Sequence, residues 1–153
     1  KLGEWLIDFC NDYLATSDAE AGTLVMDGEE AIMEVIFDPD HLRQVLTNLI
    51  DNARLHAAAS PESPVRLQWA RVAGSRRPYL DVIDNGPGIP VEHHEQVFEP
   101  FFTSHEQGTG LGLFLCQELC ELNRATISYR EGTQNGSVLR IVFADPSRWT
   151  GIS

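Results

Sequence analysis

Two short segments of the chain combine residue types that are suited to holding a nucleotide. They read Asp84-Asn85-Gly86-Pro87-Gly88-Ile89 and, further on, Gly108-Thr109-Gly110-Leu111-Gly112-Leu113. Asp84, at the end of a predicted strand, can accept a hydrogen bond from an exocyclic adenine amine, and the glycines after it let backbone pass close to a ligand. The second segment leads into a helix N-terminus, where free N–H groups and the helix dipole favour phosphate. Alone, the first segment is equally compatible with an ordinary strand-ending turn.

The charge of the chain limits how a phosphate could be held. Lys1 is the only lysine among the 153 residues, which excludes a phosphate-binding loop of the GK[ST] kind. The formal net charge of −12 repels nucleic-acid backbones, so nucleic-acid binding is not expected. An anionic ligand therefore needs a divalent cation, backbone N–H groups or a local basic cluster.

Two carboxamides could supply a cation site. Asn48 and Asn52 are four residues apart in a predicted helix, so they share one face of it, opposite the leucines. A neutral amide oxygen can ligate Mg²⁺, which prefers oxygen ligands and keeps several waters. Two merely solvated asparagines would show the same spacing. A further block, Phe98-Glu99-Pro100-Phe101-Phe102, is also compatible with a hydrophobic cluster that pins a loop.

Hydrophobic periodicity and turn residues predict the elements that position these blocks. Helices are predicted at residues 2–14, at 111–122 and after an N-cap at Asp38 with Pro39 in first position. Strands are predicted at residues 22–26 and 31–37, joined by a turn at 27–30, at 65–72 and 79–83, and at 125–129 and 137–143. Residues 85–110 form a long and therefore functional loop. The pattern predicts an α+β sandwich, a mixed, mostly antiparallel sheet covered on one face by helices.

The cysteines and the apolar segments of the sequence indicate where in the cell the protein is located. Cys10, Cys116 and Cys120 are an odd number without a CxxC pattern, which indicates reduced core thiols in a cytosolic compartment. No apolar run reaches the length of a membrane-spanning helix, and no signal peptide is visible. The sequence therefore predicts a cytoplasmic location.

Taken in order, the four blocks resemble the N, G1, F and G2 boxes of the sensor histidine kinases. The resemblance covers residues 38–143 and is to their catalytic, ATP-binding domain (HATPase_c), part of the gyrase–chaperone–kinase–mismatch-repair (GHKL) superfamily. The Phe-Phe-Thr-Ser run and short lid look most like sensors of the NtrB/PilS type. The resemblance implies a Bergerat-type α/β sandwich that binds ATP under a flexible lid. Residues 104–109 of that lid are expected to order only when phosphates are present.

The resemblance also implies roles for single residues. Asn52 would ligate Mg²⁺, Asn48 would face the phosphates, and Asp84 would read the adenine amine. Gly86 and Gly88 would shape the base of the lid, next to Ile89. The other implied nucleotide contacts are Phe101, Gly108, Thr109, Gly110, Leu111, Gly112 and Ser137, whose hydroxyl would help an ordered water bridge to adenine.

Two positions depart from the family pattern. Leu55 stands three residues after the second Asn, where many members carry Lys or Arg, and His105 stands where many carry Lys. The possible phosphate contacts are therefore Arg54, His56 and His105. Each of the three is equally compatible with a solvated surface residue.

The residue four positions before Asn52 distinguishes a kinase from a hydrolase. Hydrolytic ATPases of the superfamily carry a Glu there as the general base for water. This chain carries Asn48, an amide that cannot take a proton. The difference favours transfer to a histidine, whose imidazole is already a nucleophile, with Asn48 and Asn52 as the catalytic positions.

The acceptor histidine is expected outside this chain. Of the five histidines, His94 with Glu95 superficially fits the family's His-Glu-x-x-Asn-Pro pattern and is interpreted as a surface residue. Residues 1–20 are expected to lead in from a helical hairpin, residues 21–145 to form the ATP-binding domain and residues 146–153 a tail. The implied partners are the upstream dimerisation and phosphoacceptor domain and a response regulator. The domain would be the cytoplasmic part of a membrane-bound sensor, without direct membrane contact. A nucleotide-binding regulatory module without transfer and a hydrolytic ATPase remain alternatives.

Overall fold

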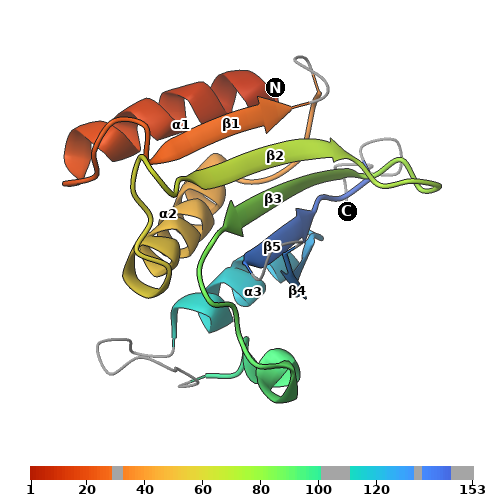
Figure 1. Cartoon of the computed structure of the whole chain (residues 1–153). Helices are drawn as coiled ribbons and strands as arrows, with labels where there is room; N and C mark the ends of the chain where they lie inside the picture. Colours follow the sequence, from red (N-terminus) through yellow and green to blue (C-terminus); the bar gives the residue numbers. More distant parts are fainter. Residues whose placement is uncertain (29–32, 101–110, 133–135, 146–153) are drawn as a thin grey trace.

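The sheet of this protein is mixed and mostly antiparallel. A computed structural model describes residues 1–28, 33–100, 111–132 and 136–145, and within these ranges five strands form one sheet in the order β1-β2-β3-β5-β4 (Figure 1). β1 pairs with β2 in parallel, and the other neighbours are antiparallel. The strands are β1 (Leu24–Gly28), β2 (Val65–Arg71), β3 (Pro78–Asp84), β4 (Thr126–Glu131) and β5 (Ser137–Val142).

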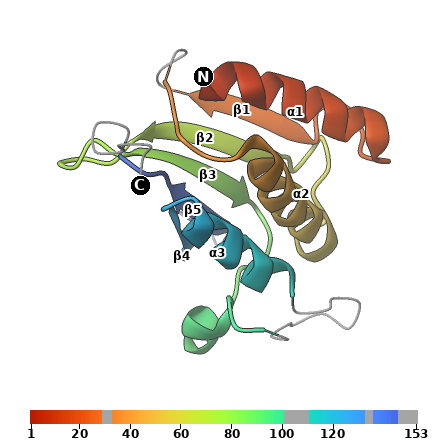
Figure 2. The same cartoon turned by 180° about the vertical axis from the view of Figure 1, so that it is seen from behind.

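Helices cover one face of this sheet. They are α1 (Leu2–Thr16), α2 (Pro39–His56) and α3 (Gly112–Leu122), and a short 3₁₀ helix, η1 (Val91–Gln96), follows β3. Figure 2 shows all three α-helices in front of the sheet, and Figure 1 shows them behind it. The predicted fold class is thereby confirmed. Within the described residues, no helix is both long enough and apolar enough to span a bilayer.

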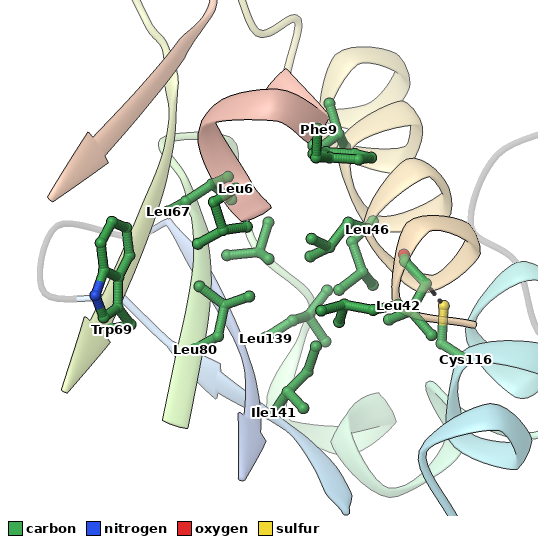
Figure 3. Packing of buried hydrophobic residues seen from close by; sticks show 14 of the residues in the cluster. Leu6, Phe9, Leu42, Leu46, Leu67, Trp69, Leu80, Cys116, Leu139 and Ile141 are labelled. Carbon is green, nitrogen blue, oxygen red and sulfur yellow. Dashed lines mark hydrogen bonds between the residues drawn. The ribbon is translucent and has the colours of Figure 1, made fainter. Parts of the chain in front are cut away.

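The core lies between the helices and the sheet. Leu6 and Phe9 of α1, Leu46 of α2, and Leu67 and Leu80 of the central strands are almost fully buried (Figure 3). The inward side chains of β2, β3 and β5 alternate with outward ones, as a half-buried strand requires. Cys10, Cys116 and Cys120 are free and buried, which confirms their prediction as core thiols.

The start of α2 is fixed by its own cap and by α3. The Asp38 carboxylate accepts hydrogen bonds from the N–H groups of Asp40 and His41, with Pro39 in the first turn, as predicted. The side-chain oxygen of Asn123, just after α3, accepts from the Asp38 N–H at 2.8 Å. Its amide nitrogen bonds the Leu119 carbonyl oxygen at 2.7 Å and His41 Nδ1 at 3.0 Å. Asn123 therefore ties together the two helices that carry the candidate site.

The hairpin predicted between residues 22–26 and 31–37 is wrong. The described part of the second segment, residues 33–37, is not a strand, and β1 instead runs through the predicted turn to Gly28 and pairs with β2. Gly28 lies opposite Trp69, whose ring fills the space that a side chain at residue 28 would need. Met33 is buried and its carbonyl oxygen accepts the Leu2 N–H at 2.9 Å. The glycine that indicated a turn therefore serves a close cross-strand contact.

Candidate nucleotide-binding site

Asp84 and Ser137 lie next to each other on the helix-covered face of the sheet. They are paired across β3 and β5, and both continue the rows of inward residues, Leu80 and Val82 on β3 and Leu139 on β5. Ser137 is buried, and Asp84 is half-buried. The sheet thus places a residue with a carboxylate and one with a hydroxyl opposite each other at the ends of two neighbouring strands.

The loop after Asp84 packs closely on the end of α2. The Asp84 side chain accepts the Gly86 N–H at 2.9 Å. A Cβ at Gly86 would come within 2.5 Å of the Ala57 Cβ, so a larger residue would force the loop away from α2. Gly88 has a φ of +76°, a backbone conformation that favours glycine. Both glycines are therefore required by the geometry of this loop.

Asn48 and Asn52 lie in the second half of α2, both half-buried. Asn48 faces α3, where it contacts Cys116: burial raises the pKa of this thiol to about 12, and a hydrogen bond with Asn48 opposes the rise. The Cys116 Sγ also lies 3.7 Å from the Val45 carbonyl oxygen, a contact drawn in Figure 3. The two helices are in direct contact at the level of Asn48.

The N-terminus of α3 follows directly on residues outside the described ranges. Leu111, which precedes the helix, is 40% exposed, and within the described residues no side chain caps the first turn. In the same part of the chain, a Cβ at Gly112 would meet no atom within 4 Å. Figures 1 and 2 place this helix start, the end of β3 and the last turns of α2 at the same end of the molecule. The first-turn backbone N–H groups of α3 therefore lie at this end of the molecule, and a helix N-terminus favours an anion.

Arg54 contacts α1 and the segment that follows it. Its guanidinium forms an ion pair with Asp18 and donates to the Tyr13 hydroxyl at 3.2 Å. The Tyr13 hydroxyl in turn donates to the Asp51 carboxylate at 2.6 Å. Burial, followed by the Asp51 hydrogen bond, raises the pKa of Tyr13 to about 12. To reach a phosphate, Arg54 would have to leave both partners.

Other predicted contacts lie outside the described part of the chain. These are Phe101, His105, Gly108, Thr109 and Gly110, the lid prediction at residues 104–109, and the His56 side chain. Their roles stay predictions.

Two residues that the sequence did not indicate hold the Gly88–Ile89 turn. Tyr129 of β4 accepts the Ile89 N–H at 2.7 Å, and His94 of η1 bonds the Ile89 carbonyl oxygen at 2.7 Å. His94 is only partly exposed, because its ring packs against the Tyr129 ring with centroids 4.7 Å apart. His94 and Ile89 lie in the same predicted loop, and their spacing in the sequence did not predict this contact.

The arrangement is that of a nucleotide-binding α/β sandwich. Residues 37–147 match the family model of the Histidine kinase-, DNA gyrase B-, and HSP90-like ATPases. The chain belongs to this family, which confirms the resemblance carried by the four boxes and agrees with ATP as the nucleotide.

The curated relatives are sensor kinases. Sensor protein kinase PilS of Pseudomonas aeruginosa is 41% identical over 150 residues, which cover 96% of this chain and 28% of PilS. Sensor histidine kinase ZraS of Salmonella typhimurium is 32% identical over 130 residues, 84% of this chain and 27% of ZraS. The chain therefore spans about a quarter of the length of these two relatives. PilS agrees with the sub-family that the motifs indicated.

Solved structures share the fold. The catalytic domain of histidine kinase ThkA, in a nucleotide-free form, superposes with a TM-score of 0.75 at 23% identity, covering 93% of this chain and 92% of that domain. ThkA in complex with response regulator protein TrrA gives a TM-score of 0.73 at 21% identity, covering 97% of this chain and 42% of that chain. At these identities the likeness concerns the fold alone.

Proposed function

We propose that this chain is the ATP-binding catalytic domain of a two-component sensor histidine kinase. In this role it binds Mg-ATP and donates the γ-phosphoryl group to a histidine on a separate dimerisation domain. The proposal is supported by the family membership and by relatives that are named sensor kinases. Because those relatives are much longer than this chain, the activity of the whole protein is part of the proposal.

The observation that carries the proposal is the carboxamide at position 48. Asn48 lies one helical turn before Asn52 and against Cys116 of α3, at the position where hydrolytic relatives would activate water. An amide cannot accept the proton of an attacking water, so this position cannot act as the general base of hydrolysis. A histidine acceptor is itself a nucleophile and needs no such base. Positioning and charge stabilisation then supply most of the catalysis.

The geometry supports a base-binding end and a phosphate-binding end. Asp84 and Ser137 would face the purine, where the carboxylate accepts from the exocyclic amine. The α3 N-terminus at Leu111 and Gly112 would face the phosphates, because the first-turn N–H groups of a helix have no partner within the helix, and among the described residues no atom lies within 4 Å of a Cβ at Gly112. Gly86, Gly88 and Ile89 would border the ligand between these ends. Phe101, Gly108, Thr109, Gly110 and the possible phosphate contacts Arg54, His56 and His105 complete the proposed set.

Magnesium would be held by Asn52, with Asn48 facing the phosphates. A carboxamide oxygen is a hard neutral ligand, and Mg²⁺ commonly takes only one or two protein ligands together with phosphate oxygens and waters. The ion would neutralise phosphate charge in a protein that is itself acidic.

The proposed partners follow from the same role. They are a dimerisation and phosphoacceptor domain, to which residues 1–20 lead, and a response regulator. A domain of the same fold has been solved in complex with the response regulator TrrA, which supports this choice. The proposed location is the cytoplasmic part of a membrane-bound sensor.

The test is transfer of labelled phosphate. This chain, incubated with γ-labelled ATP and the phosphoacceptor hairpin of its own protein, should yield acid-labile, base-stable phosphohistidine on the hairpin. Asn52→Ala should abolish Mg²⁺-dependent ATP affinity and transfer together. Intact ATP binding with no transfer over repeated trials would reject the kinase role, and rapid ATP turnover by the chain alone would favour a hydrolytic ATPase.

A second candidate is a nucleotide-gated module that binds ATP or ADP without transfer. Arg54 is paired with Asp18, and Leu55 is apolar, so these two residues of the last turn of α2 offer no unpaired cation for phosphate. Calorimetry would separate the candidates. Equal affinity for ATP and ADP, with no transfer in the full-length protein, would support the module.

A further inference from the structure

Both backbone groups of Ile89 are held by side chains, one from β4 and one from η1, which follows Ile89 in the same connection. The Tyr129 hydroxyl accepts the Ile89 N–H at 2.7 Å, and His94 Nε2 lies 2.7 Å from the Ile89 carbonyl oxygen. Because a carbonyl oxygen can only accept, His94 Nε2 carries a hydrogen. The His94 ring stands edge-on to the Tyr129 ring, with centroids 4.7 Å apart. Two residues of different elements thus form one clamp on the turn after Gly88.

The clamp favours one direction for a second hydrogen bond, in which either oxygen could donate. The Tyr129 hydroxyl lies 3.1 Å from Ser137 Oγ. Since the phenolic oxygen already accepts the Ile89 N–H, its own hydrogen is best used by donating to Ser137. In this arrangement the Ile89 N–H donates to the Tyr129 hydroxyl, and the Tyr129 hydroxyl donates to Ser137 Oγ. One lone pair of Ser137 Oγ then accepts from Tyr129, and the Ser137 hydroxyl can donate its own hydrogen to another partner.

The Ser137 hydroxyl shares one face of the sheet with Asp84. Ser137 and Asp84 are direct partners across β5 and β3, on the same face. The two side chains therefore present one donor and one acceptor to the same region. Adenine offers the matching pair on its edge, an amine that donates at C6 and a ring nitrogen that accepts at N1. Hypoxanthine offers the reverse, an oxygen at C6 and an N–H at N1.

We propose that Tyr129 and His94 are positioning residues that set purine specificity by fixing Ser137 as a hydrogen-bond donor and holding the Gly88–Ile89 turn. This inference rests on the proposed function, because it takes the purine to lie at Asp84. Neither residue needs to touch the nucleotide. Tyr129 acts through the orientation of Ser137, and His94 acts by holding Ile89 against Tyr129.

The test is a double-mutant cycle on nucleotide preference. Dissociation constants for ATP and for inosine triphosphate are measured by calorimetry for the unmodified chain, Tyr129→Phe, Ser137→Ala and the double variant. Each single variant should lower the preference for ATP by about fivefold, the loss expected for one hydrogen bond. The double variant should lose no more than Ser137→Ala alone, because Tyr129 acts through Ser137.

Matched variants separate positioning from general loss of structure. Tyr79→Phe removes the hydroxyl of a tyrosine on the opposite face of the sheet, where Arg140 stacks on its ring, and should leave the preference unchanged. His94→Gln keeps an N–H that can reach the Ile89 carbonyl oxygen and should retain most of the preference that His94→Ala loses. Ser137→Thr keeps the hydroxyl and should likewise retain it.

Three outcomes would overturn the inference. In the first, Tyr129→Phe leaves the ATP preference unchanged while the unmodified chain binds ATP, which overturns the clamp alone. In the second, the Tyr129 and Ser137 effects add fully, so Tyr129 does not act through Ser137. In the third, the unmodified chain binds no ATP, which overturns the proposed function together with the inference.

Discussion

Gly136 lies directly against the carbonyl oxygen of Asp84. A Cβ built on Gly136 would overlap that oxygen, because Gly136 leads into β5 directly beside the end of β3, its antiparallel neighbour in the sheet. No side chain fits between them. This contact sets how closely Ser137, the next residue, can approach the carboxylate of Asp84.

Gly136→Ala should therefore damage both the fold and the site. The added methyl group forces the ends of β3 and β5 apart, at a cost of about 1–3 kcal/mol in the free energy of unfolding. The same displacement separates Ser137 from Asp84, so ATP affinity should fall more than tenfold. Urea denaturation and calorimetry measure the two effects. A variant with native stability and native affinity would contradict the close packing described here.

Gly112→Ala should separate stability from binding. The Cβ enters open space in the first turn of α3, and alanine favours a helix over glycine, so the free energy of unfolding should rise by up to about 1 kcal/mol. ATP affinity should nevertheless fall if phosphate approaches the backbone there. Thermal unfolding and calorimetry on the same samples give both values. Increased stability with unchanged affinity would place the phosphates away from the α3 N-terminus.

The ion pair between Asp81 and Arg140 should contribute to the free energy of unfolding and should not affect the affinity for ATP. Arg140 donates twice to the Asp81 carboxylate, at 2.7 and 2.9 Å, and only 7% of the Asp81 side chain is exposed. Asp81→Ala leaves the Arg140 guanidinium, whose side chain is 19% exposed, without this partner and should cost about 1–3 kcal/mol. Replacing both residues by Leu and Met should recover most of that loss. ATP affinity of the double variant should match that of the unmodified chain, since the pair lies on the uncovered face.

Arg54→Gln tests whether this residue binds phosphate or joins helices. The ion pair with Asp18 and the bond to Tyr13 predict a structural role, and the loss of stability should be small because Asp18 is largely exposed. ATP affinity should change by less than about twofold. A tenfold loss of affinity at unchanged stability would instead show that Arg54 turns to the phosphates.

The three thiols predict how stability depends on pH. Burial raises the pKa of Cys10 to about 11 and that of Cys116 and Cys120 to about 12, from an ordinary value near 9. Between pH 9 and pH 11 the unfolded chain loses thiol protons that the folded chain keeps, so stability falls as the pH rises through this window. Well below pH 9 the thiols are protonated in both the folded and the unfolded chain, and they contribute no slope there. Urea denaturation from pH 8 to 11 should show this decline, and Cys120→Ala should reduce its slope.

Reactivity of the same thiols offers an independent check. At pH 8 the native chain should react slowly with a thiol reagent, since the three groups are protonated and buried. In denaturant all three should react at the rate of a free cysteine. Fast labelling of the native protein would contradict the burial of the cysteines.

Local patterns predicted the elements that depend on local chemistry. The Asp38-Pro39 start of α2 is fixed by capping within a few residues, and the stripe of leucines fixes which face of this helix is buried. The spacing of Asn48 and Asn52 then follows from the helix itself. The end of β3 at Asp84 was likewise marked by the glycines and proline after it.

Features that depend on distant parts of the chain were missed. An Asp-Gly pair favours a hairpin turn, yet Gly28 is a strand residue because Trp69, far along the sequence, occupies the space beside it. In the sequence, Tyr129 was only one residue of an alternating strand pattern. Its hydroxyl accepts the Ile89 N–H because the loop after β3 comes back to lie beside β4. The direction of Arg54 depends on the position of α1. None of these three relationships is encoded within a short window of sequence.

The parallel pairing of β1 with β2 has a consequence for the order of folding. Gly28 and Trp69 can meet only after the intervening chain has formed α2, whereas the antiparallel strands β4 and β5 follow one another closely. Closing the longer loop costs more chain entropy before any contact compensates it. Among the described strands, β1 should therefore dock late and be the first to exchange its amide hydrogens with solvent, ahead of the central strand β3.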